Sequence, residues 1–368
     1  MKIQFTHTFE DIISLENLLL AWQEFSRGKK SKPDVELFSR ELMDNIIALH
    51  ESLANKTYRH GDYESFFIND PKRRHIHKAS VRDRLLHHAV YRLLYPFFEK
   101  TFISDSFSCR LDKGTHRAIN RFRQFAYEVS KNNTKTCWVL KCDIRKFFAS
   151  IDHEILLNIL KEYIPDEDII RLLENIIGSF YTLSDKPIAH HPYPSSERRG
   201  FIVLPLSEGE TEGVCVGLPL GNLTSQLFAN IYMNKFDQWV KHWLRIKYYI
   251  RYSDDFVFLS PDKKELEDII PFIRRFLNQE LKLDLHPDKI FLKIIASGVD
   301  FLGWLNFSDY RLLRKTTRHR MLARIKNNPT LETLQSYLGL LKHGNTFKIK
   351  DFLMFIYPKE FAQLINIK

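Results

Sequence analysis

The chain has 368 residues, of which 44% are hydrophobic and 27% charged, and its formal net charge is +10. This composition excludes a disordered or fibrous chain and supports two or three domains or one large multi-part domain. The basic excess favours a polyanionic partner such as nucleic acid, although on charge alone a merely soluble basic protein is an equal alternative.

The sequence predicts a cytoplasmic protein. Its four cysteines, Cys109, Cys137, Cys142 and Cys215, form no CxxC pair, so free thiols in a reducing compartment are expected. The first residues lack the basic start of a signal peptide. No apolar run approaches the roughly 18 residues of a membrane span, so no membrane partner is expected.

The first part of the chain is predicted to be helical and then basic. Residues 1–60 have apolar residues at helical spacing in ENLLLAWQEF and ELMDNIIALHESLA, with GKKSKPD as the loop between them. Residues 71–92 are densely basic, and a helix is expected to begin near Ser80. A solvated helix face is the alternative interpretation of this basic run.

Two later segments bring an aspartate to the start of a helix or the end of a strand. Residues 137–143, CWVLKCD, form an apolar run that predicts a buried strand ending in Asp143. Asp152 is expected to cap the helix that follows.

Residues 181–215 have little periodicity and are interpreted as an irregular insertion. VGLPLGNLTSQLFANIYMNKFDQWVKHWL then predicts a glycine-bounded turn and a long helix.

The segment YIRYSDDFVFLS, residues 249–260, predicts a hairpin with Asp254 and Asp255 at its turn. Residues 264–281 have the pattern of a helix. Residues 289–307 suggest short strands with turns at two glycines. The tail from about Tyr310 is basic and then helical.

Three carboxylates therefore stand out, because neighbouring strands would bring Asp143 to the same sheet edge as Asp254 and Asp255. Converging carboxylates repel one another unless cations lie between them. Carboxylate oxygens suit Mg²⁺, and two such ions form the arrangement used for nucleotidyl transfer. A structural acid cluster is the alternative.

From about residue 60 to residue 345 the sequence resembles the reverse transcriptases. CDIRKFFASIDH resembles their motif A, GLPLGNLTSQLFANIY their motif B, YSDD their YxDD box, and FLGW their primer grip. The resemblance implies an α+β, right-hand polymerase fold. It suggests an N-terminal helical extension (1–60), fingers (61–136), a palm containing the insertion and motif B (137–307), and a helical thumb (308–368).

The resemblance also implies roles for single residues. The metal ligands would be Asp143, Asp254, Asp255 and the backbone carbonyl of Ile144, with two Mg²⁺ ions, or Mn²⁺ in their place. The nucleotide-binding candidates are Arg74, Lys78, Arg82, Arg84, Phe148 as a steric gate against ribonucleotides, Leu220, Gly221, Gln226, and Lys289 as proton donor to pyrophosphate. The primer-grip candidates are Tyr252, Phe301, Leu302, Gly303 and Trp304. The candidates for contact with the nucleic-acid backbone are Arg311, Arg314, Lys315, Arg318, Arg320 and Arg324.

Motif B bears on the subfamily. Many reverse transcriptases have QGxxxSP, whereas this chain has Leu220 and Gln226 in LGNLTSQ, as in reverse transcriptases of diversity-generating retroelements. In that family the missing glutamine is linked to misincorporation opposite adenine. A related antiphage-defence enzyme working with a noncoding RNA and a non-catalytic RNA-binding scaffold are the alternatives. The expected partners are an RNA template, a DNA primer, dNTPs and an accessory RNA-binding protein.

Overall fold

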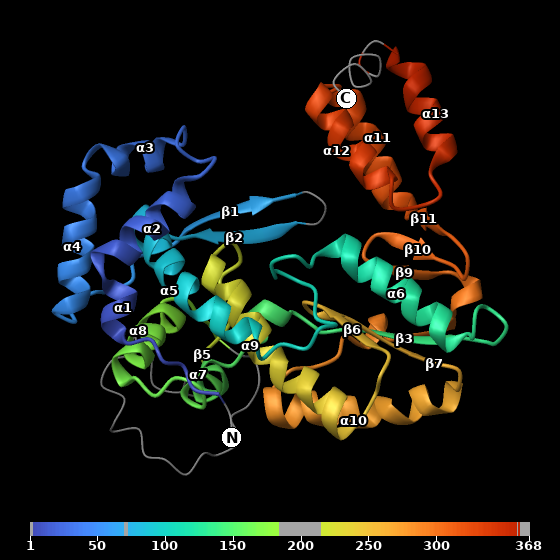
Figure 1. The fold of residues 1–368 in the computed structure, drawn as a ribbon, viewed down its shortest axis with the longest axis horizontal. Helices are drawn as coiled ribbons and strands as arrows, with labels where there is room; N and C mark the ends of the chain where they lie inside the picture. Colours follow the sequence, from blue (N-terminus) through green and yellow to red (C-terminus); the bar gives the residue numbers. More distant parts are fainter. Residues whose placement is uncertain (1–2, 70–72, 184–214, 359, 361–368) are drawn as a thin grey trace, which may run out of the picture. The chain divides into compact units, whose positions relative to one another are not determined.

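A computed structural model of the chain describes residues 3–69, 73–183, 215–358 and 360 (Figure 1). Most of the predicted insertion at 181–215 lies outside these residues. The chain forms two compact units. Unit 1 consists of residues 1–103, 144–243 and 274–285; unit 2 consists of residues 104–143, 244–273 and 286–368.

The N-terminal part of unit 1 is helical, as predicted. Its helices are α1 (Phe9–Ile13), α2 (Leu15–Ser26), α3 (Pro33–Arg40) and α4 (Leu42–Ala54). The hydroxyls of Thr8 and Ser14 cap α1 and α2 by accepting hydrogen bonds from backbone amides. Helix α3 was not predicted, because its Pro33 was taken as a loop signal. A proline is favoured in the first turn of a helix, where its missing N–H costs nothing.

An antiparallel hairpin follows, formed by β1 (Glu64–Ile68) and β2 (Arg74–Lys78). The sequence did not predict it, because basic residues dominate the second strand. Helix α5 (Val81–Glu99) begins at the predicted place, with the Ser80 hydroxyl as its N-cap. It packs against α2 and against α9 (Leu223–Gln238). The N-terminal helices and the helix of motif B are therefore both in contact with α5.

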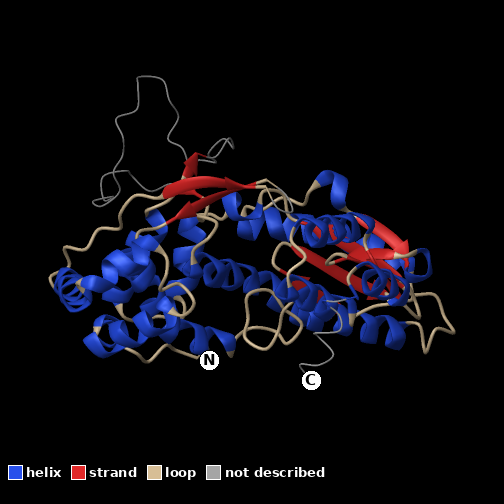
Figure 2. Ribbon diagram, turned by 90° about the horizontal axis from the view of Figure 1, so that it is seen from above, coloured by secondary structure: helices blue, strands red, loops and turns tan. Residues whose placement is uncertain are grey.

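Most of the remaining described part of unit 1 is helical, as Figure 2 shows. Its elements are η1 (Phe147–Ser150), α7 (His153–Lys161), α8 (Glu167–Gly178), β4 (Thr182–Leu183), β5 (Cys215–Val216), α9, and the π-helical turn η3 (Trp239–Trp243). The Asp152 carboxylate caps α7 by accepting a hydrogen bond from the Ile155 amide at 3.0 Å, as predicted.

Unit 2 is built on an antiparallel sheet with the strand order β6-β7-β3-β8. Its strands are β3 (Trp138–Asp143), β6 (Tyr249–Tyr252), β7 (Asp255–Ser260) and β8 (Phe291–Ile294). Helix α6 (Thr115–Val129) packs on β6 and β7 with an apolar face that includes Phe122 and Phe125. Helix α10 (Lys263–Leu281) follows β7, and the division between the units falls within it.

A second sheet in unit 2 has the order β11-β10-β9 and is followed by helices. Its strands are β9 (Val299–Phe301), β10 (Trp304–Asn306) and β11 (Arg311–Leu313), and the single turns η4 (Pro287–Lys289) and η5 (Ile295–Ser297) precede it. The helices are α11 (Lys315–Asn327), α12 (Leu331–Leu341) and α13 (Phe347–Ile356).

One hydrophobic core joins both sheets of unit 2 to these last helices. Phe122 of α6, Val257 of β7, Trp304 of β10, Met321 of α11 and Leu353 of α13 all belong to it. Strand β11 also lies beyond the predicted palm boundary, yet it pairs with β10. The division into fingers, palm and thumb at the predicted residues stays a prediction.

The turn between α12 and α13 depends on a glycine. A Cβ at Gly344 would overlap the Trp304 ring and lie 2.9 Å from the Arg311 carbonyl oxygen. We therefore expect Gly344→Ala to lower the free energy of unfolding by about 1–3 kcal/mol, measured by urea denaturation. Gly339→Ala is the matched control, since no described atom outside the adjoining helix backbone lies within 4 Å of that Cβ, and alanine favours a helix by up to about 1 kcal/mol. Equal stability changes would contradict this packing.

Candidate active site

Asp143 and Asp255 face each other across two antiparallel strands. Strand β3 ends at Asp143, β7 begins at Asp255, and the two residues are direct partners in the ladder. The apolar residues of both strands, such as Leu140 and Phe258, hold this register in the buried sheet. The predicted convergence of these two carboxylates is therefore present within unit 2.

The turn that carries Asp254 is held by an arginine that sequence reasoning missed. Tyr252 and Asp255 close the hairpin, and Ser253 adopts a positive φ of 60°, which two-residue hairpin turns require. The guanidinium of Arg251 is fully buried and donates to the Ser253 carbonyl at 3.2 Å and to the Ser106 hydroxyl at 3.1 Å. A single arginine in the otherwise apolar YIRY was the available signal.

Two lysines neutralise the facing carboxylates. The Lys289 ammonium donates to Asp143 Oδ1 at 2.7 Å, and the Lys141 ammonium lies 3.3 Å from Asp255 Oδ2. Lys289 was predicted to act at this site, whereas Lys141 was not noticed. Burial raises the pKa of Asp255 from its usual value near 3.8 to about 6, and the charges of Asp143 and Asp254 add to this effect while Lys141 opposes it.

The donor atoms suit a hard divalent cation. Asp255 Oδ1 is buried and has no hydrogen-bond partner within the described part of the chain, and such an atom is unstable without a cation or donor. Among the same residues, no three His, Cys, Asp or Glu side chains are already gathered as a metal site. This finding agrees with the two lysine contacts, because the ammonium groups of Lys289 and Lys141 occupy carboxylate oxygens that a metal ion would need. The carboxylate oxygens of Asp143 and Asp255 are of the donor type that suits Mg²⁺.

Unit 1 contains the predicted motif B turn, and this turn binds strand β2. The Leu220 carbonyl accepts a hydrogen bond from the His77 amide at 3.0 Å. Gly221 has a φ of 116°, and a Cβ there would lie 3.0 Å from Ile76 Cγ2. The glycine is therefore required by close packing on the hairpin. Gln226 is half-buried in the first turn of α9.

Two more predicted residues lie in or beside η1 of unit 1. Phe148 is half-buried in η1, and its carbonyl accepts a hydrogen bond from the Leu218 amide at 2.7 Å. This bond ties the motif A turn to the segment leading into motif B. Ile144 is buried and forms an isolated bridge with Leu285.

The basic candidates of the fingers are mostly engaged with acids of unit 1. Lys78 and Arg84 both pair with Asp34, a residue of the unpredicted helix α3. Burial alone would raise the pKa of Asp34, but these two cations outweigh it and lower the pKa to about 2. Arg82 pairs with the buried Asp83, while Arg74 is exposed on β2.

The predicted primer grip is the turn between β9 and β10. Leu302 and Gly303 form this turn with positive φ angles of 51° and 85°. Phe301 and Trp304 on either side are buried in the core of unit 2, so they anchor the turn. Tyr252, in the neighbouring sheet, accepts a hydrogen bond from the Thr115 hydroxyl at 3.1 Å.

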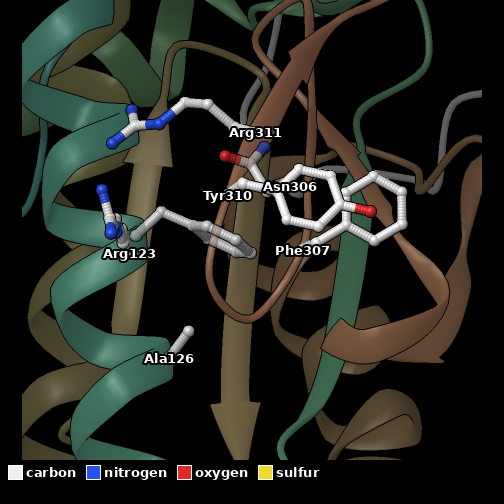
Figure 3. A pocket seen from close by; sticks show the side chains of 7 residues that line it. Arg123, Ala126, Asn306, Phe307, Tyr310 and Arg311 are labelled. Atoms are coloured by element: carbon white, nitrogen blue, oxygen red, sulfur yellow. The ribbon is translucent and has the colours of Figure 1, made fainter. Parts of the chain in front are cut away.

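Some basic residues after the predicted primer grip are buried or paired with an acid, and others are exposed on α11. Arg311 is buried, and its guanidinium donates to Asn120 of α6 at 3.0 Å, as its direction in Figure 3 illustrates. It is an internal residue, which its sequence position did not reveal. Arg314 pairs with Asp300 at 3.1 Å. The side chains on α11 are exposed: Lys315, Arg318, Arg320 and Arg324.

Comparison with known proteins decides the family. The family described as "Reverse transcriptase (RNA-dependent DNA polymerase)" matches residues 69–305. The chain belongs to the reverse transcriptase family. It therefore has the mixed α+β, right-hand polymerase fold that its motifs predicted. No helix in the described ranges is long and apolar enough to cross a bilayer.

Similar members of the reverse transcriptase family are distant in sequence. Protein YkfC of Escherichia coli (strain K12) is 25% identical over 282 residues, covering 68% of this chain and 66% of that protein. The group II intron-encoded protein LtrA of Lactococcus lactis subsp. cremoris is 20% identical, covering 86% of this chain and 58% of LtrA. The chain thus spans about two thirds or less of these relatives.

Two solved structures have low similarity scores. A chain from a partial Cas6-RT-Cas1–Cas2 complex has 22% identity and a TM-score of 0.41, covering 75% of this chain and 43% of that one. An apo telomerase from Candida tropicalis has 12% identity and a TM-score of 0.44, covering 75% and 59%.

The raised pKa of Asp255 predicts a pH-dependent stability of this reverse transcriptase without divalent metal. The folded carboxyl holds its proton more tightly than the unfolded one, so this group lowers stability as the pH rises from about 4 to about 6. We expect Asp255→Asn to raise the melting temperature above pH 6 in EDTA, and the gain to vanish below about pH 4. Asp268→Asn, which changes an exposed residue of α10, is the control. A gain that is constant with pH would refute the burial effect.

Proposed function

We propose that this chain is an RNA-directed DNA polymerase that extends a DNA primer with dNTPs along an RNA template. The carrying observation is the direct pairing of Asp143 with Asp255 across β3 and β7, with Asp254 in the adjoining turn. Membership of the reverse transcriptase family supports the choice of substrates. The cognate RNA would be a noncoding or template-repeat RNA, and an accessory RNA-binding protein would be a further partner.

The proposed reaction is transfer of a nucleotide to the primer. The primer 3′-oxygen attacks the α-phosphorus of the dNTP and loses its proton, and the bond to the pyrophosphate oxygen breaks. Asp143, Asp254, Asp255 and the Ile144 carbonyl would hold two Mg²⁺ ions, or Mn²⁺. Such ions activate the hydroxyl and neutralise the charge that develops on phosphate. Lys289, which now donates to Asp143, would protonate the leaving pyrophosphate.

Further residues would select the substrates. We assign Phe148 as the barrier to a ribose 2′-hydroxyl, and Leu220, Gly221 and Gln226 as the turn beside the nucleotide and template. Arg74 is the fingers cation best available to the triphosphate, because Lys78, Arg82 and Arg84 are paired with acids. Leu302 and Gly303, with Tyr252, would contact the primer end.

The exposed cations of α11 would hold the duplex. Lys315, Arg318, Arg320 and Arg324 project from one helix that has no acid. Contacts of this kind bind the phosphate backbone by charge and do not read the base sequence. Arg314 would also contact the duplex backbone. Buried Arg311 would support β11, the strand that leads into α11.

Removing one catalytic carboxylate tests the reaction. Asp254→Ala should abolish primer extension on an RNA template, by at least about 10³-fold, while the far-UV circular dichroism stays unchanged. Asp268→Ala, which removes an exposed aspartate of α10, should extend primers normally. Normal extension by Asp254→Ala would refute the assignment. RNA binding by the unaltered protein without incorporation in Mg²⁺ or Mn²⁺ would favour a non-catalytic scaffold.

We further propose that the enzyme serves a diversity-generating retroelement. The support is Leu220 at the position where many reverse transcriptases have a glutamine that can donate a hydrogen bond. A leucine cannot donate one to the nucleotide, so the geometry of the new base pair is checked less strictly. An antiphage-defence role has no such requirement for inaccurate copying.

Restoring the glutamine tests this role. Leu220→Gln should lower misincorporation opposite template adenine by about 10-fold, since one hydrogen bond of about 1.4 kcal/mol distinguishes the pairs. Sequencing of the cDNA from an adenine-rich template measures the effect. Leu220→Met, which keeps an apolar side chain, should remain inaccurate. Accurate copying by the unaltered enzyme would contradict the mutagenic role and favour defence-related synthesis.

A further inference from the structure

Lys141 connects two parts of unit 2 that the proposed reaction uses. It lies in β3 two residues before Asp143, so both side chains project from the same face of the sheet. Its ammonium lies 3.3 Å from Asp255 Oδ2 and donates to the backbone carbonyl of Asp300 at 3.1 Å. Only 18% of the Lys141 side chain is exposed, so these contacts are held in a confined position.

The first contact places a positive charge beside the carboxylate cluster. Asp255 stands opposite Asp143 in the ladder, and its Oδ1 is buried with no hydrogen-bond partner among the described residues. Lys289 already donates to Asp143, so Lys141 is the cation at Asp255 itself. An ammonium at this distance attracts a carboxylate oxygen and fixes its direction.

The second contact reaches the primer-grip hairpin. Asp300 is the middle residue of β9, and the turn formed by Leu302 and Gly303 follows directly. The Asp300 carboxylate in turn accepts from Arg314 at 3.1 Å. Lys141 thus joins Asp255 to β9, the strand before the predicted primer-grip turn. A shift of that strand would move the ammonium group that contacts the carboxylate.

We propose that Lys141 is a positioning residue that fixes the orientation of the Asp255 carboxylate and its place relative to the hairpin of β9 and β10. The inference rests on the proposed polymerase function for its kinetic consequence. The contacts themselves are independent of that function. A divalent cation bound at Asp255 would take over part of the charge compensation, so the need for the ammonium should be greatest without metal.

A stability cycle on the full chain tests the contact without using activity. In EDTA, Lys141→Met should lower the melting temperature by about 2–6 °C, and millimolar Mg²⁺ should restore part of the loss. In an Asp255→Asn background, the same substitution should change the melting temperature by less than about 1 °C. The control is Lys293→Met, which removes an exposed lysine of β8. An equal loss in both backgrounds, or no recovery with Mg²⁺, would overturn the proposal.

Single-nucleotide kinetics test the positioning role. Lys141→Met should lower kcat by about 10- to 100-fold and leave KM for the dNTP within about 3-fold. Lys141→Arg keeps the charge and should retain most of the rate. Unchanged kcat in Lys141→Met would overturn the inference. If the unaltered protein makes no DNA, the proposed function fails, and the stability cycle still decides whether Lys141 supports Asp255.

Discussion

The pairing of two carboxylates across β3 and β7 is the constraint on which the rest of unit 2 depends. Asp143 and Asp255 are fixed as neighbours by the strand register, and a buried sheet cannot slip by one residue without exposing its apolar face. Their mutual repulsion must therefore be met by nearby positive charge. The protein supplies this charge with Lys289 and Lys141, one for each carboxylate.

The sequence predicted the carboxylates better than it predicted what surrounds them. Asp143 and the hairpin at Asp254 are local features, because each follows from an apolar strand pattern and a turn. The partners Lys141 and Arg251 follow from contacts between segments that are distant in the chain, and no periodicity encodes them. The same reason explains the unpredicted role of Asp34, whose partners lie on β2 and α5.

The net positive charge suggests a polyanionic partner, but it does not show which cations are available to bind one. Lys78 and Arg84 share one acid inside unit 1, and Arg311 is buried against α6. Each of these charges stabilises a local contact, and binding a phosphate would require that contact to break. The basic side chains of α11 have no such burial. Burial and pairing therefore identify structural cations that the sequence alone does not distinguish from those suited to nucleic acid.

The primer-grip motif illustrates how a sequence signature can combine two physical roles. Phe301 and Trp304 are core residues, while Leu302 and Gly303 between them form a turn in which both residues have positive φ angles. Gly344, after α12, packs on the same tryptophan, so the position of the turn depends on the helices that follow. Because Lys141 contacts the backbone of β9 as well as Asp255, one side chain links the carboxylate cluster to the strand before this turn within unit 2. Nucleotidyl transfer needs a primer hydroxyl and a metal-binding carboxylate at a fixed separation. Under the proposed function, a core that includes both strands, with Lys141 in contact with each, would help to hold the two at such a separation.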